Sequence, residues 1–342
     1  MPDRKKSCNV CVVGVGAVGV EILRVLRQRK FPIQQLTVLD RSDRTVEVDG
    51  RSYEVKPVSA EAFEGQGIVL FAGTEGEKGA AVTYAPEAIR RGAVCVDNGA
   101  DFRMDPNVPL VVPEVNPDDL EKHAGLIANP NCSTIQMVVA LAPIHRRFRL
   151  KRVIVSTYQA ASSAGSKAAE ALREETSALL EDRPPPKPEE MPQRLGFNVF
   201  PQIGPFQELG YTSEEWKLVK ETHKILHDNR IPINPTAVRV PVFNAHSESI
   251  YFETAEPATL SEIRQIWRRA AGLRLVEEPG YPTPAEASHR DEVFVGRLRP
   301  DPVVKNAFSC WVVSDNLRKG AALNAVQIAE LLFHAGLRRH PV

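Results

Sequence analysis

A cysteine directly before an apolar, helix-like segment has the setting of a covalent catalyst. Cys132 stands in the stretch N-P-N-C-S-T and is followed by the apolar run I-Q-M-V-V-A-L-A-P-I. Pro130 disfavours helix before the cysteine, and Ser133 or Thr134 can cap a helix that starts here. A thiolate at a helix N-terminus is stabilised by the helix dipole, which makes the thiol more reactive. We therefore predict Cys132 as a nucleophile, although most lone cysteines are small buried apolar residues.

A glycine pattern near the start of the chain predicts a site for a dinucleotide. The letters G-V-G-A-V-G follow an apolar, strand-like run and precede a segment with helical spacing. Glycines allow a tight turn and close backbone approach, and the helix N-terminus offers free N–H groups to a pyrophosphate. The predicted cofactor-binding residues of this loop are Gly14, Val15, Gly16, Ala17, Val18 and Gly19.

The residues after the next predicted strand give conflicting signals about the cofactor. Asp40 lies where an acid holds a ribose 2′-hydroxyl, which favours NAD. Arg41, Ser42 and Arg44 follow at once and can bind a 2′-phosphate, which favours NADP. These residues therefore do not decide between NAD and NADP.

The first part of the chain predicts a Rossmann-like domain over residues 1–133. Short apolar runs alternate with helix-like segments, which is typical of a doubly wound parallel sheet. The expected strands are at 9–18, where the apolar run ends in glycines, and at 36–40, 67–73, 94–99 and 126–133, with a helix at 79–92.

The pattern changes after residue 150 to longer, half-polar strand-like runs. Helical segments at 166–182 and 260–272 lie between them, and a proline-rich loop follows the first. This predicts an α+β domain with a mixed sheet over 134–318, for catalysis and dimerisation. A last helical segment, within 319–342, is expected to return to the cofactor domain.

Composition excludes several classes of protein. The 342 residues include 43 Lys or Arg and 43 Asp or Glu, so no basic bias points to nucleic acid. No apolar run reaches the roughly 20 residues that a membrane span needs. Five scattered cysteines indicate reduced thiols in the cytoplasm, and the pair Cys8 and Cys11 has no second pair to complete a metal site. We expect a cytoplasmic protein without metal.

A general base must accompany a catalytic thiol, and His246 is the candidate. It lies in R-V-P-V-F-N-A-H-S-E-S, on a strand-like run that begins at Arg239. Nothing in the sequence alone brings His246 to Cys132.

These motifs occur together in one known family. The run comprises GVGAVG, DNGADFRMD at 97–105, VPEVN at 112–116, NPNCST at 129–134, STYQAASSAG at 156–165, FNVFPQIG at 197–204, EEWKLVKETHKIL at 214–226, RVPVFNAHSES at 239–249, VFVGRLRPD at 293–301 and DNLRKGAALNAVQIAE at 315–330. In order and spacing the chain resembles the bacterial aspartate-semialdehyde dehydrogenase family over nearly its whole length.

The resemblance implies a reaction and roles for its residues. The family reduces L-aspartyl 4-phosphate to L-aspartate 4-semialdehyde with NADPH, releases phosphate, and serves lysine, threonine and methionine biosynthesis. It implies a thioester on Cys132, acid–base work by His246 and a substrate contact by Gln159. Substrate-binding positions are Arg239 for the α-carboxylate, Glu214 for the α-ammonium, Arg103 and Lys217 for phosphate, and Asn131 beside the nucleophile. Ser162, Ser163 and Asn316 match positions near the cofactor, and a homodimer or homotetramer is implied.

Departures from the family pattern leave alternatives open. The family has S-G-A-G where this chain has a serine at 163, and N-S-S-A-F-R where Gly99 and Asp101 now precede the arginine. Its A-S-x-R-S stretch is replaced by D-R-S-D-R at 40–44. One alternative is a related acyl-phosphate reductase such as N-acetyl-glutamyl-phosphate reductase, whose substrate has no free amine for Glu214. The other is a non-catalytic paralogue that acts as a binding protein.

Overall fold

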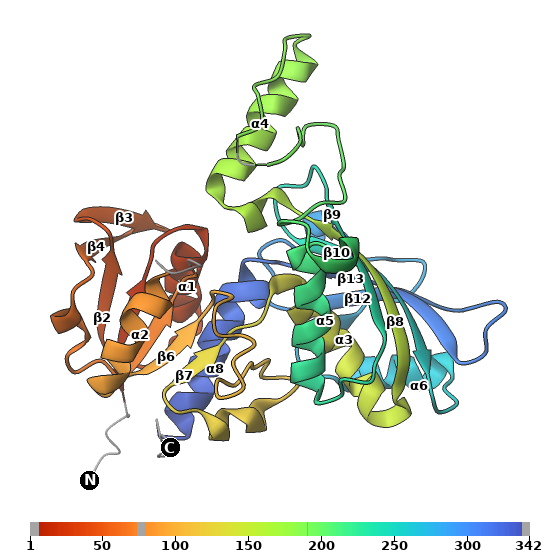
Figure 1. Ribbon diagram of the computed structural model, residues 1–342, viewed down its shortest axis with the longest axis horizontal. Coiled ribbons are helices and arrows are strands. Elements are labelled where there is room, and N and C mark those ends of the chain that lie inside the picture. Colours follow the sequence, from red (N-terminus) through yellow and green to blue (C-terminus); the bar gives the residue numbers. More distant parts are fainter. Residues whose placement is uncertain (1–6, 74–78, 190, 337–342) are drawn as a thin grey trace. The chain divides into compact units, whose positions relative to one another are not determined.

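The computed structural model describes residues 7–73, 79–189 and 191–336, and its contacts divide the chain into two compact units (Figure 1). The first unit is Met1–Pro130 together with Ala321–Val342, and the second is Asn131–Gly320. Asn131 and Cys132, which the sequence placed at the end of the first domain, thus belong to the second unit.

The first unit is built on a doubly wound sheet, as the alternating pattern predicted. Seven strands run in the order β3-β4-β2-β1-β5-β6-β7, and all pairs are parallel except β3 with β4. The strands are β1 (Cys8–Val13), β2 (Ile33–Asp40), β3 (Arg44–Val48), β4 (Arg51–Pro57), β5 (Ile68–Phe71), β6 (Val94–Asp97) and β7 (Leu126–Ala128). The β3–β4 hairpin was not predicted, because its strands alternate charged and apolar residues and are mostly exposed.

Helices cover both faces of this sheet. Helices α1 (Ala17–Gln28) and α8 (Leu323–His334) pack together with Val10 and Val12 of β1. Helix α2 (Ala80–Arg90) packs with Cys11 and Val13, which point to the opposite face because strand side chains alternate. Burial raises the pKa of Cys11, so this thiol is a small core residue, as its position on the first strand predicted.

The second unit contains the predicted mixed sheet. Six strands run in the order β11-β12-β13-β10-β8-β9, with β8–β9 and β11–β12 parallel and the other pairs antiparallel. They are β8 (Leu150–Gln159), β9 (Ile233–Arg239), β10 (His246–Thr254), β11 (Leu273–Leu275), β12 (Val293–Pro300) and β13 (Ala307–Ser314).

Three helices support the face of this sheet that carries the site. Helix α3 (Cys132–Phe148) packs on β10 and β13, and α5 (Ser213–Leu226) packs on β9 and on α3 (Figure 1). Helix α6 (Leu260–Arg269) is fixed to α3 by the indole of Trp267, which donates to the Ala140 carbonyl at 2.8 Å. Among the described residues, no helix combines the length and apolar character that crossing a membrane requires.

Candidate active site

Helix α3 begins at Cys132, where the sequence predicted a helix start. The cap is Asn131, whose side-chain oxygen accepts from the N–H groups of Ser133 at 3.0 Å and Thr134 at 3.3 Å. The expectation that Ser133 or Thr134 caps the helix is therefore wrong. Asn131 has the extended backbone that a cap residue requires, whereas the two hydroxyl residues already lie inside the first turn.

Cys132 differs from the other thiols in its exposure. Of the five cysteines, all of them within the described residues, only Cys132 is half-buried, while the others are buried. Burial raises the pKa of Cys8 to about 11 and raises that of Cys310 further. Gly320 packs tightly on Cys132, because a Cβ added to that glycine would lie 2.8 Å from the Cys132 Cβ.

Three of the predicted site residues form one row across the mixed sheet. Gln159 on β8 pairs with Arg239 on β9. Ser247 on β10 pairs with Tyr158, so the antiparallel register brings His246 opposite Gln159. Directly paired residues share a face, so Arg239, Gln159 and His246 project to the same side of the sheet.

His246 is held in one tautomer when it is neutral. Its Nδ1 accepts a hydrogen bond from the backbone N–H of Ala160 at 3.0 Å, so the neutral ring carries its proton on Nε2. Among the described residues, Nε2 has no hydrogen-bond partner. Complete burial, helped by the positive charge of Arg239, lowers the pKa of His246 to about 3. The ring is therefore a neutral donor near neutral pH.

Arg239 offers part of its guanidinium to a ligand. Nη1 donates to the carbonyl of Ala160 at 2.6 Å and to the hydroxyl of Ser163 at 2.7 Å. Within the described part of the chain, Nε and Nη2 make no hydrogen bond, so two N–H directions remain for a carboxylate. Burial lowers the pKa of Arg239, and the negative charges of Glu214 and Cys132 oppose that effect. Cys132 and Glu214 therefore lie close enough to Arg239 for their charges to affect its pKa.

Glu214 connects the row to Asn131, the residue before Cys132. Its Oε1 accepts from Gln159 Nε2 at 3.0 Å and from Asn131 Nδ2 at 2.8 Å, while Lys217 Nζ lies 3.5 Å from Oε2. Glu214 is only 7% exposed, so it does not form a solvated surface pair with Lys217 three residues further along the helix. The predicted residues all belong to one unit, in which hydrogen bonds, an ion pair and strand pairing join most of them: Cys132, Asn131, Gln159, Glu214, Lys217, Arg239 and His246.

Two supporting residues escaped the sequence analysis. Glu221 accepts from the backbone N–H of Asn131 at 2.7 Å and is 1% exposed. It lies seven residues after Glu214, on the same face of α5, and that spacing is the signal that would have found it. Thr157 donates to Gln159 Oε1 at 3.0 Å and so fixes which amide atom faces Glu214.

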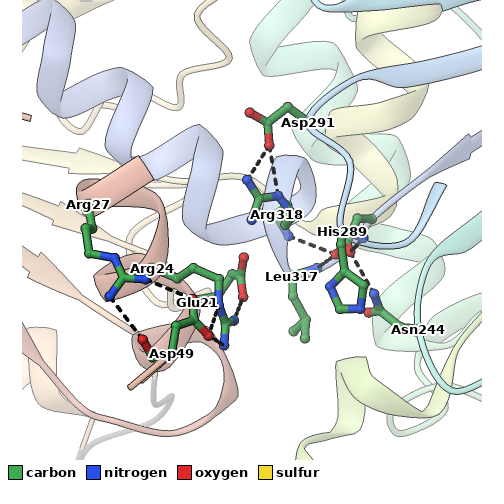
Figure 2. A network of polar contacts seen from close by, with 10 residues as sticks. Glu21, Arg24, Arg27, Asp49, Asn244, His289, Asp291, Leu317 and Arg318 are labelled. Carbon is green, nitrogen blue, oxygen red and sulfur yellow. Dashed lines mark hydrogen bonds and ion pairs between the residues drawn. The ribbon is translucent and has the colours of Figure 1, made fainter. Parts of the chain in front are cut away.

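The residues that the family resemblance places near the cofactor have two kinds of contacts. Asn316 Nδ2 donates to the Ser162 hydroxyl at 3.0 Å, so these two lie together as the resemblance implied. Ser163 instead donates to the Ala160 carbonyl at 3.2 Å and contacts Arg239. The loop that carries Asn316 is anchored by Arg318, whose Nη2 lies 2.5 Å from Asp291 (Figure 2).

The glycine loop of the first unit fits a dinucleotide pyrophosphate. Gly14 has a φ of +92°, which a tight left-handed turn requires and which favours glycine. A Cβ on Gly19 would lie 1.9 Å from the Gly14 carbonyl oxygen, so only glycine lets α1 pack this closely on the loop. A Cβ on Gly16 would meet nothing within 4 Å, which leaves the approach to the helix N-terminus open. These are the three roles that glycines have in such sites.

The remaining predicted residues also lie in the first unit. Arg103 is 6% exposed, and its Nη2 donates to the Asn98 carbonyl at 2.8 Å. Asp101, the unexpected acid, is exposed. Asp40 ends β2 beside the glycine loop, where its carboxylate accepts from the Val15 N–H at 3.2 Å. Arg41 and Ser42 follow it on the surface.

Comparison with known proteins gives a consistent picture over both units. Residues 9–123 match the family described as "Semialdehyde dehydrogenase, NAD binding domain", and residues 141–319 match "Semialdehyde dehydrogenase, dimerisation domain". A protein of Aquifex aeolicus named aspartate-semialdehyde dehydrogenase is 48% identical over 340 residues, which cover 96% of this chain and 99% of the relative. Its Bacillus subtilis namesake is 47% identical over 344 residues, which cover 96% and 98%.

Solved structures agree with these sequences. The crystal structure of aspartate semialdehyde dehydrogenase II from Vibrio cholerae has a TM-score of 0.92 and 42% identity, and covers 96% of this chain and 99% of that one. A structure from Candida albicans described with NADP shares the fold at 22% identity. With the two domain matches and the identity of these relatives taken together, the chain belongs to the aspartate-semialdehyde dehydrogenase family.

Proposed function

We propose that this chain is a cytoplasmic biosynthetic enzyme that reduces L-aspartyl 4-phosphate to L-aspartate 4-semialdehyde through a thioester on Cys132. The observation that carries the proposal is the row of Arg239, Gln159 and His246, joined through Glu214 to the residue before Cys132. A related Vibrio cholerae structure is described as complexed with ASA, which supports the substrate class.

The thiolate of Cys132 begins the reaction. The helix N-terminus and the positive charge of Arg239 favour the ionised sulfur. The sulfur attacks the acyl carbon, a C–S bond forms, and the C–O bond to phosphate breaks with phosphate as the leaving group. Nε2 of His246 already carries a proton, so His246 does not act as the base for the thiol that the sequence suggested. The thiol loses its proton to solvent before the attack.

The second stage is reduction of the thioester. A bound nicotinamide coenzyme supplies the hydride, and the resemblance implies NADPH for this role. His246 donates a hydrogen bond from Nε2 to the oxygen that gains negative charge and so stabilises the hemithioacetal oxyanion. The oxyanion then re-forms the C=O bond, the C–S bond breaks, the sulfur keeps the electron pair as thiolate, and the aldehyde leaves.

Charged residues of the second unit match a substrate with an α-amino acid head. The free N–H directions of Arg239 suit the α-carboxylate. Glu214 offers a buried carboxylate to the α-ammonium, and Lys217 beside it suits phosphate. An N-acetylated substrate has no ammonium, so the buried carboxylate argues against N-acetyl-glutamyl-phosphate reductase.

The test measures phosphate-dependent coenzyme reduction in the reverse direction with each semialdehyde. L-aspartate 4-semialdehyde should be oxidised over many turnovers only when phosphate is present, and Cys132→Ala should abolish turnover with no change in the far-ultraviolet circular dichroism. Greater activity with N-acetyl-glutamate semialdehyde would favour the related reductase. Absence of activity with both would favour a non-catalytic paralogue.

We also propose a homodimer, with a homotetramer as the larger alternative, through the face of the mixed sheet opposite α3. The match to a dimerisation domain supports this. The rings of Tyr158 and Trp311 pack there with centroids 5.3 Å apart and an interplanar angle of 45°, and Ile154 is 41% exposed. Sedimentation velocity should show no monomer at micromolar concentration.

A further inference from the structure

Asp40 is fixed against the glycine loop by the backbone. It is the last residue of β2, and its Oδ2 accepts from the Val15 N–H at 3.2 Å while Oδ1 accepts from the Arg41 N–H at 2.8 Å. The N–H of Gly14 also donates to the Leu39 carbonyl at 2.8 Å, so the loop and the strand end are joined twice. The position of this carboxylate is therefore determined by main-chain contacts.

The carboxylate is ionised where it lies. Partial burial by itself raises the pKa of Asp40, but the donors on Arg41, Val15 and Arg44 outweigh burial and hold that pKa below its ordinary value. A full negative charge thus stands at the strand end that faces the adenosine ribose in dinucleotide-binding folds.

Arg44, one of the two arginines that could neutralise a 2′-phosphate, is already paired, while the other, Arg41, is exposed on the loop. Arg44 Nη2 lies 2.5 Å from Asp40 Oδ2, and its Nη1 lies 3.4 Å from the Ser42 hydroxyl. Arg44 opens the β3–β4 hairpin, whose tip is anchored to α1 by Arg24 at 2.9 Å from Asp49 (Figure 2). The hairpin thus keeps Arg44 paired with Asp40, so that Arg44 does not serve to bind a 2′-phosphate.

We propose that Asp40 makes NAD(H) the preferred coenzyme of this chain, with the carboxylate accepting from the ribose hydroxyls and repelling a 2′-phosphate. The inference rests on the proposed function only in requiring a nicotinamide dinucleotide. It departs from the NADPH that the family resemblance implies. The glycine spacing G-x-G-x-x-G and an acid at the end of the second strand form the NAD fingerprint together, and here a hydrogen bond joins them.

The experiment measures the binding of NAD+ and NADP+ to the intact protein without substrate, by titration calorimetry. NAD+ should bind about tenfold or more tightly than NADP+, because a carboxylate and a phosphate dianion within a few ångströms repel strongly. Asp40→Asn keeps the shape and removes the charge, so the preference should shift toward NADP+ by about tenfold. The same preference should appear in kcat/KM with L-aspartate 4-semialdehyde.

Asp43→Asn is the matched control, because Asp43 is an exposed acid of the same loop. It makes the same change of charge and should alter the preference less than about twofold, since its carboxylate is exposed to solvent. NADP+ binding more tightly than NAD+ to the wild-type protein would overturn the inference, as would equal effects of the two substitutions. An Asp40-dependent preference in a protein that fails to oxidise the semialdehyde would refute the proposed function alone.

Discussion

Substitution of Arg239 by lysine tests whether the guanidinium binds the substrate carboxylate as a fork. The variant keeps a positive charge on the central row but replaces a rigid set of N–H donors with one ammonium group. In the wild-type protein, Nη1 is occupied by Ala160 and Ser163, so the ligand must use the other edge of the guanidinium. Lysine cannot serve both sets of partners from one nitrogen.

The expected loss follows from the number of contacts removed. One charge-assisted hydrogen bond contributes about 1.5–3 kcal/mol, which corresponds to about a 10- to 150-fold loss in kcat/KM. The carboxylate is remote from the reacting carbon, so most of the loss should appear in KM and less in kcat. Initial rates of coenzyme reduction with L-aspartate 4-semialdehyde and phosphate measure both constants.

An analogue and a control variant separate recognition from general damage. In 3-aminopropanal a hydrogen replaces the carboxylate, so wild type and Arg239→Lys should use it equally poorly. Arg230→Lys changes an arginine whose side chain is 78% exposed and bound to Asp228, and it should leave kcat/KM within about twofold. If Arg239→Lys keeps near-normal kcat/KM with the true substrate, the assignment of Arg239 to the carboxylate is refuted.

Three further predictions concern buried groups around the site. Complete burial raises the pKa of Glu248 well above that in the unfolded chain, so this residue costs stability as the pH rises above the unfolded value. Glu248→Gln should therefore raise the free energy of unfolding in urea by at least about 1 kcal/mol at pH 8 and by less at pH 5. A difference between variant and wild type that does not grow with pH would contradict this. Gly320→Ala should slow alkylation of Cys132 and reduce kcat about tenfold or more, because the new methyl group meets a Cβ at 2.8 Å; unchanged rates would show that the contact relaxes freely. With the pKa of His246 lowered to about 3, its protonation should not limit kcat/KM between pH 5 and 8. Any acidic limb near pH 6.5 that disappears in His246→Gln would contradict the neutral-donor assignment.

Local signals in the sequence were sufficient for the elements that carry the site. The proline before Cys132 and the apolar run after it correctly predicted where α3 begins, because both act within one helical turn. The alternating pattern likewise predicted the doubly wound sheet. The cap was assigned wrongly because Asn131, Ser133 and Thr134 are all good cap residues, and only backbone conformation distinguishes them.

Contacts between segments that are distant in the sequence could not be predicted from the sequence alone. The row of Arg239, Gln159 and His246 depends on the register of three strands that are up to about 90 residues apart in sequence, which no periodicity encodes. Composition did not decide between Asp40 and Arg44 either, because the ion pair that holds Arg44 on Asp40 forms only in the folded hairpin. The sequence thus indicates which groups these residues carry, and contacts in the folded chain determine which partners each group has.

The covalent role of Cys132 is tested most directly by trapping the acyl enzyme. Phosphate is omitted, and the protein is mixed with L-aspartate 4-semialdehyde and oxidised coenzyme, so that the thioester forms but cannot be released to phosphate. A burst of reduced coenzyme equal to the enzyme concentration is expected, with the aspartyl group on the peptide that contains Cys132 by mass spectrometry. A burst of the same size in Cys132→Ala, or an aspartyl group on another residue, would contradict the account.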